Sequence, residues 1–439
     1  MTHVHDRAVI VSTGDEVTVG QLLDTNGQYF AQRLMSLGVL PIEHATVPDE
    51  LAVLVDTLKR SCARAPLVIM SGGLGPTDGD LTRQAVAALT GDTLVLDGAA
   101  REEIAAMLAK RGRPMTERQE RQAYRPRRAE CLSNAMGTAP GLHARVESGG
   151  GWGTTDLFCL PGPPGELRPM FAGGVVPRLR LDPSRVIATR LCHIVGVPEA
   201  ECVQRLGDLT RRDANPLVGI TASGGILTLR IRAETSGARS DAEAMVDQAE
   251  ARAREVLGDN LFGVGAGTGW ENLCRSVLGL MAERSQTLGV VESCTGGMLG
   301  EMLTTVPGAS EAFVGGMITY ANALKESLGV RGETLVRHGA VSAEVAGEMA
   351  TAGLERLGVD HCLAITGVAG PDGGSDSKPV GTVHVALASR GVALDARKFL
   401  FTGDREDIRR RSAVSGLAML HFRLRGHGSG RPRLIWEVS

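Results

Sequence analysis

A serine and a lysine in the last third of the chain form a candidate catalytic pair. Ser293 comes shortly after the apolar run 288–291. The apolar run 317–319 ends at Tyr320-Ala321-Asn322, and Lys325 follows one helical turn later. If these runs are parallel strands joined by one right-handed crossover, their carboxyl ends lie side by side at the edge where ligands bind. A serine needs a base within hydrogen-bond reach, and a lysine whose pKa is lowered by burial can act as that base. The pair therefore predicts a serine-type hydrolase.

Polar, glycine-rich loops surround this pair in the sequence. Backbone N–H groups of such glycines can stabilise an oxyanion or hold a phosphate. Arg405 and Arg409 lie one turn apart on a predicted helix and are candidate phosphate clamps. The candidate substrate-binding residues are Thr295, Gly296, Gly297, Asn322, Thr366, Gly367, Gly370 and Arg405.

Taken one by one, these residues also fit structural roles. A serine before two glycines is typical of a turn or a helix cap. Cys294 is a rival nucleophile, but no histidine lies near it in the sequence to activate it. His361 and His384 fall within predicted strands and are interpreted as structural rather than as metal ligands. Only the combination of these residues favours catalysis.

A second glycine-rich loop follows the apolar run 67–71. Glycine loops at the end of a buried strand can cradle phosphates, and neighbouring carboxylates can hold a bridging divalent cation. The alternative is that Asp80 only caps the helix that follows. The candidates are Gly72, Gly73, Gly75 and Thr77 for the phosphates, and Asp80, Asp78 and Asp15 for the cation.

Three predicted α/β or α+β segments position these loops. Residues 1–173 alternate short apolar strands with amphipathic helices, which predicts a mainly parallel sheet covered on both faces. Residues 174–262 predict a small α+β module with a hairpin turning at Ser223-Gly224-Gly225, and its expected role is a spacer or a dimerisation element. Residues 268–425 predict a second α/β domain, and residues 426–439 a frayed tail.

Composition argues against several classes of function. The net charge is −3 and aromatic residues make up 3%, which leaves little electrostatic or stacking basis for binding nucleic acid. No apolar stretch approaches the roughly 20 residues of a membrane helix, and no signal peptide is recognised. The eight cysteines include no Cys-x-x-Cys pair and are expected to be reduced. We expect a cytoplasmic protein with no nucleic-acid or membrane partner.

The C-terminal motifs together resemble one family. Segments 291–297, 320–325, 339–342, 366–374 and 378–382 are similar, in order, to the C-terminal domain of the CinA (competence/damage-inducible) family. That family includes nicotinamide-mononucleotide (NMN) deamidases, which hydrolyse the carboxamide to nicotinate mononucleotide and ammonia. The resemblance implies Ser293 as nucleophile and Lys325 as base, with Tyr320 and Asn322 orienting the lysine or the amide. It implies no cofactor for this reaction, and a homodimer.

The N-terminal motifs resemble the molybdopterin-binding fold of the MoaB/MogA type and, more closely, the N-terminal CinA domain. They comprise segments 14–16, 24–26, 72–82, 137–141 and 161–166. Some relatives hydrolyse ADP-ribose with a divalent metal, so NMN and ADP-ribose are the small-molecule nucleotides that the resemblance implies. The usual pattern has two adjacent aspartates before Leu-Thr, but here Gly79 replaces the first of them, and a ligand shifted to Asp78 falls outside metal-bond tolerance unless the loop adapts.

Two other functions remain open at this point. The first is a nucleotide- or pterin-binding regulatory protein in which one or both sites are catalytically silent. A silent C-terminal site would have no need of a buried base beside Ser293, so Lys325 discriminates between the deamidase and the silent binding protein. The second is a structural protein of DNA uptake, which the charge and composition do not support.

Overall fold

The computed structural model describes residues 3–427 and 432–438. The chain forms two compact units, one comprising residues up to 187 together with 235–239, and the other comprising 188–234 and residues from 240 onward. No helix in these described ranges is long and apolar enough to cross a membrane.

The first unit is built on a six-stranded sheet in the order β2-β1-β3-β8-β7-β6. The first four of these strands are parallel, and β7 and β6 run antiparallel to their neighbours. Their carboxyl ends therefore bring the loops after β1, β3 and β8 to one edge. The strands are β1 (Arg7–Thr13), β2 (Leu40–Val47), β3 (Leu67–Ser71), β6 (Glu130–Leu132), β7 (Gly141–Glu147) and β8 (Thr154–Leu160).

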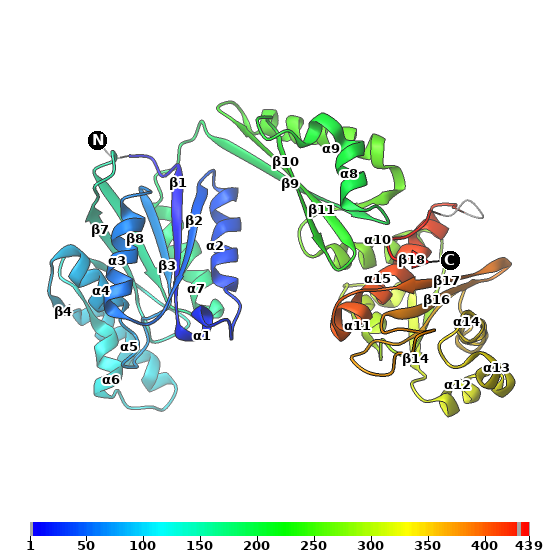
Figure 1. The fold of residues 1–439 in the computed structure, drawn as a ribbon. Helices are drawn as coiled ribbons and strands as arrows, with labels where there is room; N and C mark the ends of the chain where they lie inside the picture. The colour runs from blue at the N-terminus through cyan, green and yellow to red at the C-terminus, as the bar shows by residue number, and fades with distance from the viewer. Residues whose placement is uncertain (1–2, 428–431, 439) are drawn as a thin grey trace. The chain divides into compact units, whose positions relative to one another are not determined.

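Helices cover both faces of this sheet, as predicted (Figure 1). Alternate residues of β1 point to opposite faces, so Ile10 packs with α2 (Thr25–Ser36) and α7 (Pro164–Met170) while Val11 packs with α3 (Leu51–Cys62) and α4 (Thr82–Thr90). The remaining elements are α1 (Asp15–Thr18), β4 (Leu94–Leu96), α5 (Gly98–Lys110), α6 (Glu117–Glu120) and β5 (Tyr124–Pro126), with short turns of 3-10 or π-helix at Arg121–Ala123, Phe171–Val175 and Val176–Arg178.

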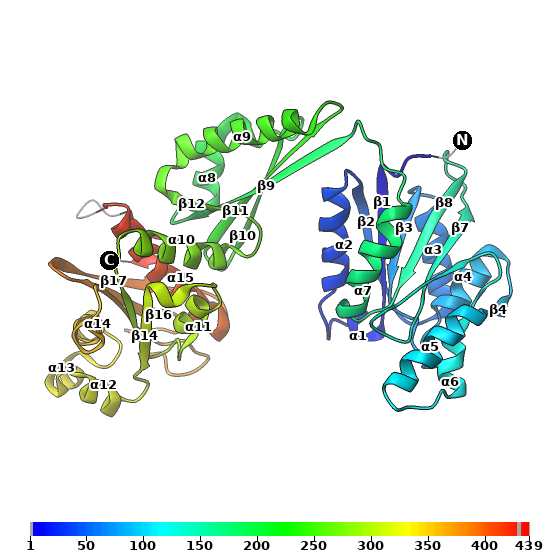
Figure 2. The ribbon, with the colours of Figure 1, turned by 180° about the vertical axis from the view of Figure 1, so that it is seen from behind.

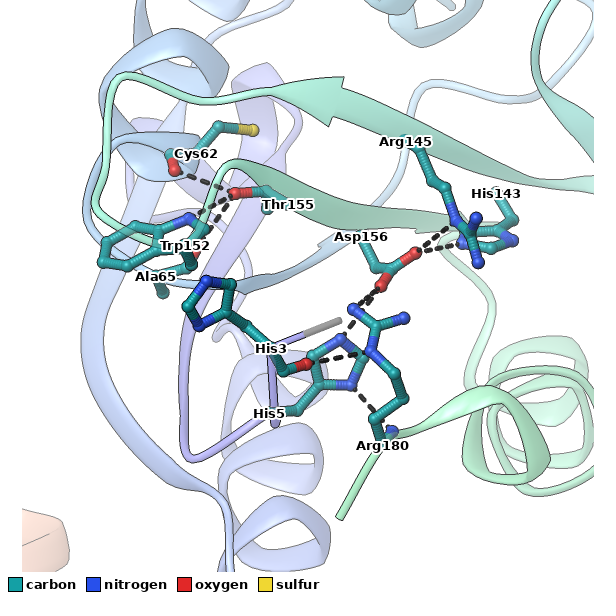
Figure 3. Close-up of polar contacts among 10 residues, drawn as sticks. All are labelled: His3, His5, Cys62, Ala65, His143, Arg145, Trp152, Thr155, Asp156 and Arg180. Atoms are coloured by element: carbon teal, nitrogen blue, oxygen red, sulfur yellow. Dashed lines mark hydrogen bonds and ion pairs between the residues drawn. The ribbon is translucent and has the colours of Figure 1, made fainter. Parts of the chain in front are cut away.

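A buried carboxylate at the opposite end of β8 ties the start of the chain to the sheet. Asp156 is 2% exposed and accepts hydrogen bonds from His5 (2.9 Å) and His143 (2.8 Å). It also forms an ion pair with Arg180 at 2.5 Å (Figure 3). Burial by itself would raise the pKa of Asp156, but the hydrogen bonds and the charge of Arg180 lower it below its ordinary value. This network is structural, because it lies away from the loop edge described above.

The second unit begins with the small α+β module. Its sheet has the order β10-β11-β9-β12, and α8 and α9 pack on it (Figure 2). The predicted hairpin is present, with Ser223 paired to Ile226 and both intervening glycines at positive φ. The elements are β9 (Val186–Val195), α8 (Glu199–Leu206), a 3-10 turn at Gly207–Thr210, β10 (Leu217–Ser223), β11 (Ile226–Thr235), α9 (Arg239–Leu257), a 3-10 turn at Gly258–Asn260 and β12 (Leu261–Val264). The last strand of the module thus ends two residues beyond the boundary predicted at residue 262.

The rest of this unit is built on a sheet in the order β14-β13-β15-β16-β17-β18. Only β14, β13 and β15 are parallel, so the sheet is mixed. Its strands are β13 (Leu288–Glu292), β14 (Phe313–Ile318), β15 (His361–Gly367), β16 (Thr382–Ser389), β17 (Val392–Leu400) and β18 (Glu437–Val438).

Two groups of helices cover this sheet. Residues of α10 (Gly269–Glu283), α11 (Met298–Thr304) and α15 (Arg405–Leu424) pack with Val290 and Ile365 on one face. Residues of α12 (Asn322–Leu328), α13 (Gly332–His338) and α14 (Ala343–Leu357) pack with Val291 and Ala364 on the other. A 3-10 turn at Ala309–Glu311 precedes β14.

The end of the chain differs from the prediction of a frayed tail. Leu434 is 5% exposed and belongs to the domain core, and β18 pairs with Lys398 and Phe399 of β17. Residues 428–431 and 439 of the predicted tail lie outside the described residues. The prediction failed because the run of glycines before residue 432 masks a short edge strand after it.

Candidate active site

Ser293 and Lys325 meet at the carboxyl ends of two neighbouring parallel strands. Ser293 is the first residue after β13, and Lys325 lies on α12, which follows β14. The Nζ atom of Lys325 is 3.1 Å from Ser293 Oγ. The two side chains are 1% and 7% exposed respectively. The pair predicted from sequence spacing is therefore in hydrogen-bond contact and screened from water.

The surroundings of Lys325 favour a neutral amine. Its Nζ also contacts the main-chain oxygens of Thr319 (2.8 Å) and Tyr320 (3.0 Å), and among the described residues no carboxylate forms an ion pair with it. Burial lowers the pKa of Lys325, with a small opposing effect of Cys294. A neutral amine has two N–H bonds for the two carbonyls and one lone pair for the Ser293 hydroxyl proton. These contacts therefore suit a general base.

A buried glutamate, which the sequence analysis did not single out, shapes the loop after Ser293. Glu292 is 1% exposed, and its carboxylate accepts hydrogen bonds from the N–H groups of Gly297 (3.0 Å), Leu299 (3.1 Å) and Gly300 (2.9 Å). It thus caps the start of α11 and holds the turn that presents Ser293. The sequence did contain a signal for this role, because Glu292 is an acidic residue at the end of an apolar run, directly before Ser293.

The glycine N–H groups expected to hold an oxyanion are engaged inside the protein. Gly297 donates to Glu292, and Gly296 donates to the main-chain oxygen of Ser293 at 3.1 Å. In the described part of the chain, the N–H groups of Cys294 and Thr295 donate to no other residue, and the Cys294 N–H contacts only its own thiol. Two adjacent N–H groups directly after the nucleophile are the ones left for a developing oxyanion.

Three other predicted binding residues pack inward. Thr366 donates from Oγ1 to the main-chain oxygen of Ala340 at 2.8 Å. A Cβ atom on Gly367 would lie 2.9 Å from the main-chain oxygen of Thr382, so close strand packing requires this glycine. Gly370 has φ of +76° and accepts a hydrogen bond from Arg405 through its main-chain oxygen. These three residues hold the walls of the site rather than its opening.

The two arginines of α15 join the loops of the site. Arg405 donates to the main-chain oxygen of Gly370 (2.6 Å) and to the Tyr320 hydroxyl (3.3 Å). Arg409 donates to the main-chain oxygen of Thr295 at 2.6 Å. Because Arg405 is also exposed, its positive charge beside the loops of the site is accessible to a ligand. Tyr320 contacts the lysine through its main-chain oxygen, and Asn322 is exposed at the start of α12.

The rival nucleophile is poorly placed. Cys294 is 6% exposed, and burial raises the pKa of its thiol to about 12. At neutral pH the thiol therefore stays protonated and weakly nucleophilic. All eight cysteines are free thiols.

The two histidines interpreted as structural lie inside strands of the sheet. His361 bonds the Ser389 hydroxyl through Nδ1 at 2.8 Å. Burial, followed by the charges of Lys398 and Lys378, lowers the pKa of His384 to about 4.

Comparison with known proteins agrees with these motifs. Three family descriptions match in order: “Probable molybdopterin binding domain” over residues 9–181, “Damage-inducible protein CinA KH domain” over 189–263, and “CinA C-terminal domain” over 271–424. A competence-damage inducible protein of Symbiobacterium thermophilum is 40% identical over 96% of this chain and 99% of its own. The chain belongs to the CinA family. A CinA-like protein of Anaeromyxobacter is 38% identical over 95% of this CinA chain and 98% of its own.

Solved structures of CinA-family proteins are similar to part of this chain. The crystal structure of competence/damage inducible protein CihA from Agrobacterium tumefaciens is 35% identical and covers 36% of this chain and 97% of that one, with a TM-score of 0.35. A CinA superfamily protein from Escherichia coli is 32% identical over 38% of this chain, with a TM-score of 0.34.

In the N-terminal CinA domain, the glycine-rich loop after β3 closes on its own aspartate. Asp80 accepts hydrogen bonds from the N–H groups of Gly75 and Thr77, both at 2.7 Å, and from the Thr77 hydroxyl at 2.5 Å. The N-cap of α4 is Leu81, so the alternative of Asp80 as a simple helix cap is wrong. Gly72 and Gly73 both have positive φ, and a Cβ on Gly72 would collide with the main-chain oxygen of Thr13. A cavity of about 320 Å³ lies beside this loop.

The three carboxylates predicted to bind a cation have separate partners. Asp80 holds the loop, Asp78 pairs with Arg121 at 3.1 Å, and Asp15 accepts from the N–H group of Asp49 at 3.2 Å. Within the described ranges, no group of three or more His, Cys, Asp or Glu side chains lies close enough to hold a metal. The residues present do not fit the metal that the resemblance implies, and we derive no metal-dependent step.

Proposed function

We propose that the C-terminal domain is an amidohydrolase that deamidates NMN to nicotinate mononucleotide and ammonia, with Ser293 as nucleophile and Lys325 as base. The contact between a buried, unpaired lysine and the serine hydroxyl carries this proposal. The family resemblance of the motifs supports the choice of substrate. A silent binding site would gain nothing from burying a lysine without a counter-charge, which costs free energy.

The proposed reaction has two halves. Ser293 Oγ attacks the carboxamide carbon while its proton moves to Lys325 Nζ, and the N–H groups of Cys294 and Thr295 stabilise the oxyanion. The lysine then returns that proton to the departing amine, which leaves as ammonia and gives a serine ester. Water attacks the ester with the lysine again as base, releasing nicotinate mononucleotide and restoring Ser293. The exposed guanidinium of Arg405, beside the Gly370 loop, suits the substrate phosphate.

Ammonia release from NMN by the purified full-length chain tests this function directly. We expect steady release, with nicotinate mononucleotide formed in equal amount. Ammonia release from nicotinamide riboside, which lacks the phosphate, should be slower, because Arg405 then has no anion to bind. Absence of release from NMN would favour the regulatory binding protein instead.

The cysteine beside the nucleophile should be dispensable. We expect Cys294→Ala to retain deamidation within about threefold of the wild type, because its buried thiol is protonated at neutral pH. Steady-state kinetics of ammonia release measures this. A loss as large as that of a nucleophile variant, with circular dichroism unchanged, would transfer the nucleophile assignment to Cys294.

The N-terminal domain should gain hydrolysis when the missing aspartate is restored. A Cβ on Gly79 would lie 3.9 Å from Asp49 Oδ2, and its φ is not left-handed, so Gly79→Asp fits and adds a carboxylate beside Asp49. Burial, followed by the charges of Asp15 and Glu16, raises the pKa of Asp49 despite its bond to Thr13. The neighbouring negative charges would be relieved by a cation. Because the carboxylates of the wild type do not gather around a cation, we expect no metal-dependent hydrolysis of ADP-ribose from it, and we expect Gly79→Asp to introduce a measurable rate.

The matched control is Gly79→Asn, which has the same shape without the charge. Release of AMP from ADP-ribose in the presence of Mg²⁺ or Mn²⁺ is the measurement. A rate for Gly79→Asp at or below that of the wild type would show that this loop is arranged for another purpose.

A further inference from the structure

A cavity of about 360 Å³ lies where the small α+β module meets the C-terminal domain. The two parts share one core here, since Ile226 of β11 packs in the same cluster as Leu273 of α10 and Val414 of α15. The turn between β10 and β11 lies near α10 in both views (Figure 1 and Figure 2). The cavity is thus lined by both parts of one compact unit, and none of its lining residues belongs to the Ser293 site.

The charged side chains that line this cavity are all basic. Arg230 of β11 and Arg410 of α15 contribute guanidinium groups, and no Asp or Glu is among the lining residues. Arg410 pairs with the exposed Glu406, whereas Arg230 has no hydrogen-bond or ion-pair partner among the described residues. Glu271, one residue after the lining residue Trp270, accepts a hydrogen bond from the N–H group of Thr268 at 2.9 Å. The cavity therefore favours an anion.

The remaining lining residues are suited to a ring that carries hydroxyl groups. Trp270 is a flat aromatic surface at the start of α10, and the hydroxyls of Thr221 and Ser223 come from the module. The Thr228 hydroxyl also lines the cavity but already contacts His193 Nδ1 at 3.0 Å. The volume lies at the lower end of the range for small-molecule sites, about 300–1,000 Å³. A phosphate held by guanidinium groups and a base stacked on tryptophan would use each of these features.

We propose that this cavity is a second ligand site, which binds a phosphorylated ring compound of mononucleotide size. It goes beyond the proposed deamidase, because it uses none of the residues of that reaction. Arg410 is adjacent to Arg409 on α15, and Arg409 holds the main-chain oxygen of Thr295 in the catalytic loop. A ligand in the cavity would therefore contact α15, the helix whose Arg409 holds the loop that carries Ser293.

A nucleic-acid strand fits this cavity less well than a mononucleotide. Modules of the KH type clamp a strand with a Gly-x-x-Gly loop, but the connection between α8 and β10 contains a single glycine, Gly207, and no such motif. The net charge of −3 also gives the chain no broad electrostatic attraction for a polyanion.

Titration of the full-length chain with AMP tests the proposal. We expect saturable binding by calorimetry that is weakened about tenfold or more in Arg230→Gln and in Arg410→Gln, because each variant removes a charge-assisted hydrogen bond. The matched control is Arg205→Gln on α8, outside the cavity, which should bind as the wild type does. AMP should also change the tryptophan fluorescence of Trp152→Phe and Trp436→Phe, but not that of Trp270→Phe.

Several results would overturn the proposal. The first two are no AMP binding at all, or binding that both arginine variants retain in full, which would locate it elsewhere. If inorganic phosphate binds as tightly as AMP, the ring does not contribute to binding, and the site binds phosphate rather than a phosphorylated ring compound. Displacement of AMP by an oligothymidylate of higher affinity would make nucleic acid the occupant.

Discussion

Ser293→Ala is expected to reduce ammonia release from NMN by about four orders of magnitude or more, because no other hydroxyl or thiol of the described residues hydrogen-bonds the base. NMN binding by calorimetry should change little, since the loop that carries the residue is held by Glu292 and Arg409 rather than by the serine hydroxyl. The combination of lost turnover and retained binding is the signature of a missing nucleophile.

The matched control is Ser327→Ala, which removes an exposed hydroxyl from the same helix as Lys325. Among residues 3–427 and 432–438, Ser327 Oγ bonds only the main-chain oxygen of Ala323, so this variant should turn over at the wild-type rate. Turnover of the Ser293→Ala protein at a tenth of the wild-type rate or more would exclude a covalent role for that serine. Equal binding and equal turnover in all three proteins would leave the deamidase proposal without its nucleophile.

The sequence could predict which residues meet, because strand order follows from simple rules. The runs ending before Ser293 and Tyr320 are apolar and of strand length, and one crossover between them makes them parallel neighbours. Parallel strands align their carboxyl ends, so the contact between Ser293 and Lys325 follows once the runs are recognised. The family resemblance, rather than this geometry, supplied the substrate.

The sequence could not predict which hydrogen-bond partner each polar group takes. Gly296 and Gly297 were expected to face a ligand, but the carboxylate of Glu292 and the oxygen of Ser293 take their N–H groups first. Similarly, Asp80 could have pointed outward to a cation, yet it accepts three hydrogen bonds from its own loop. Such choices depend on tertiary geometry, because a carboxylate binds whichever donors the folded backbone brings to it.

Lys325→Met is expected to abolish deamidation as completely as Ser293→Ala, and the double variant should be no worse than either, because the two residues act as one unit. In the wild type, kcat/KM should rise with pH as Lys325 loses its proton and then level off. Burial lowers the pKa of Lys325, so this rise should be centred below the ordinary lysine value of about 10.4. Lys398→Met, which removes a lysine from β17 of the same domain, should keep both the rate and the profile.

The pH dependence of the free energy of unfolding should report the lowered pKa of Lys325 independently of turnover. A pKa that is lower in the folded chain means that the unfolded chain binds more protons between that value and about 10.4, so the free energy of unfolding should rise with pH across this window. Lys325→Met should flatten that rise, which urea unfolding at a series of pH values would measure. If Lys325→Met keeps the slope of the wild type, the lysine is not held in the neutral form that the proposed mechanism needs. If it loses the slope but keeps its activity, the lysine is buried and neutral, and some other group is the base.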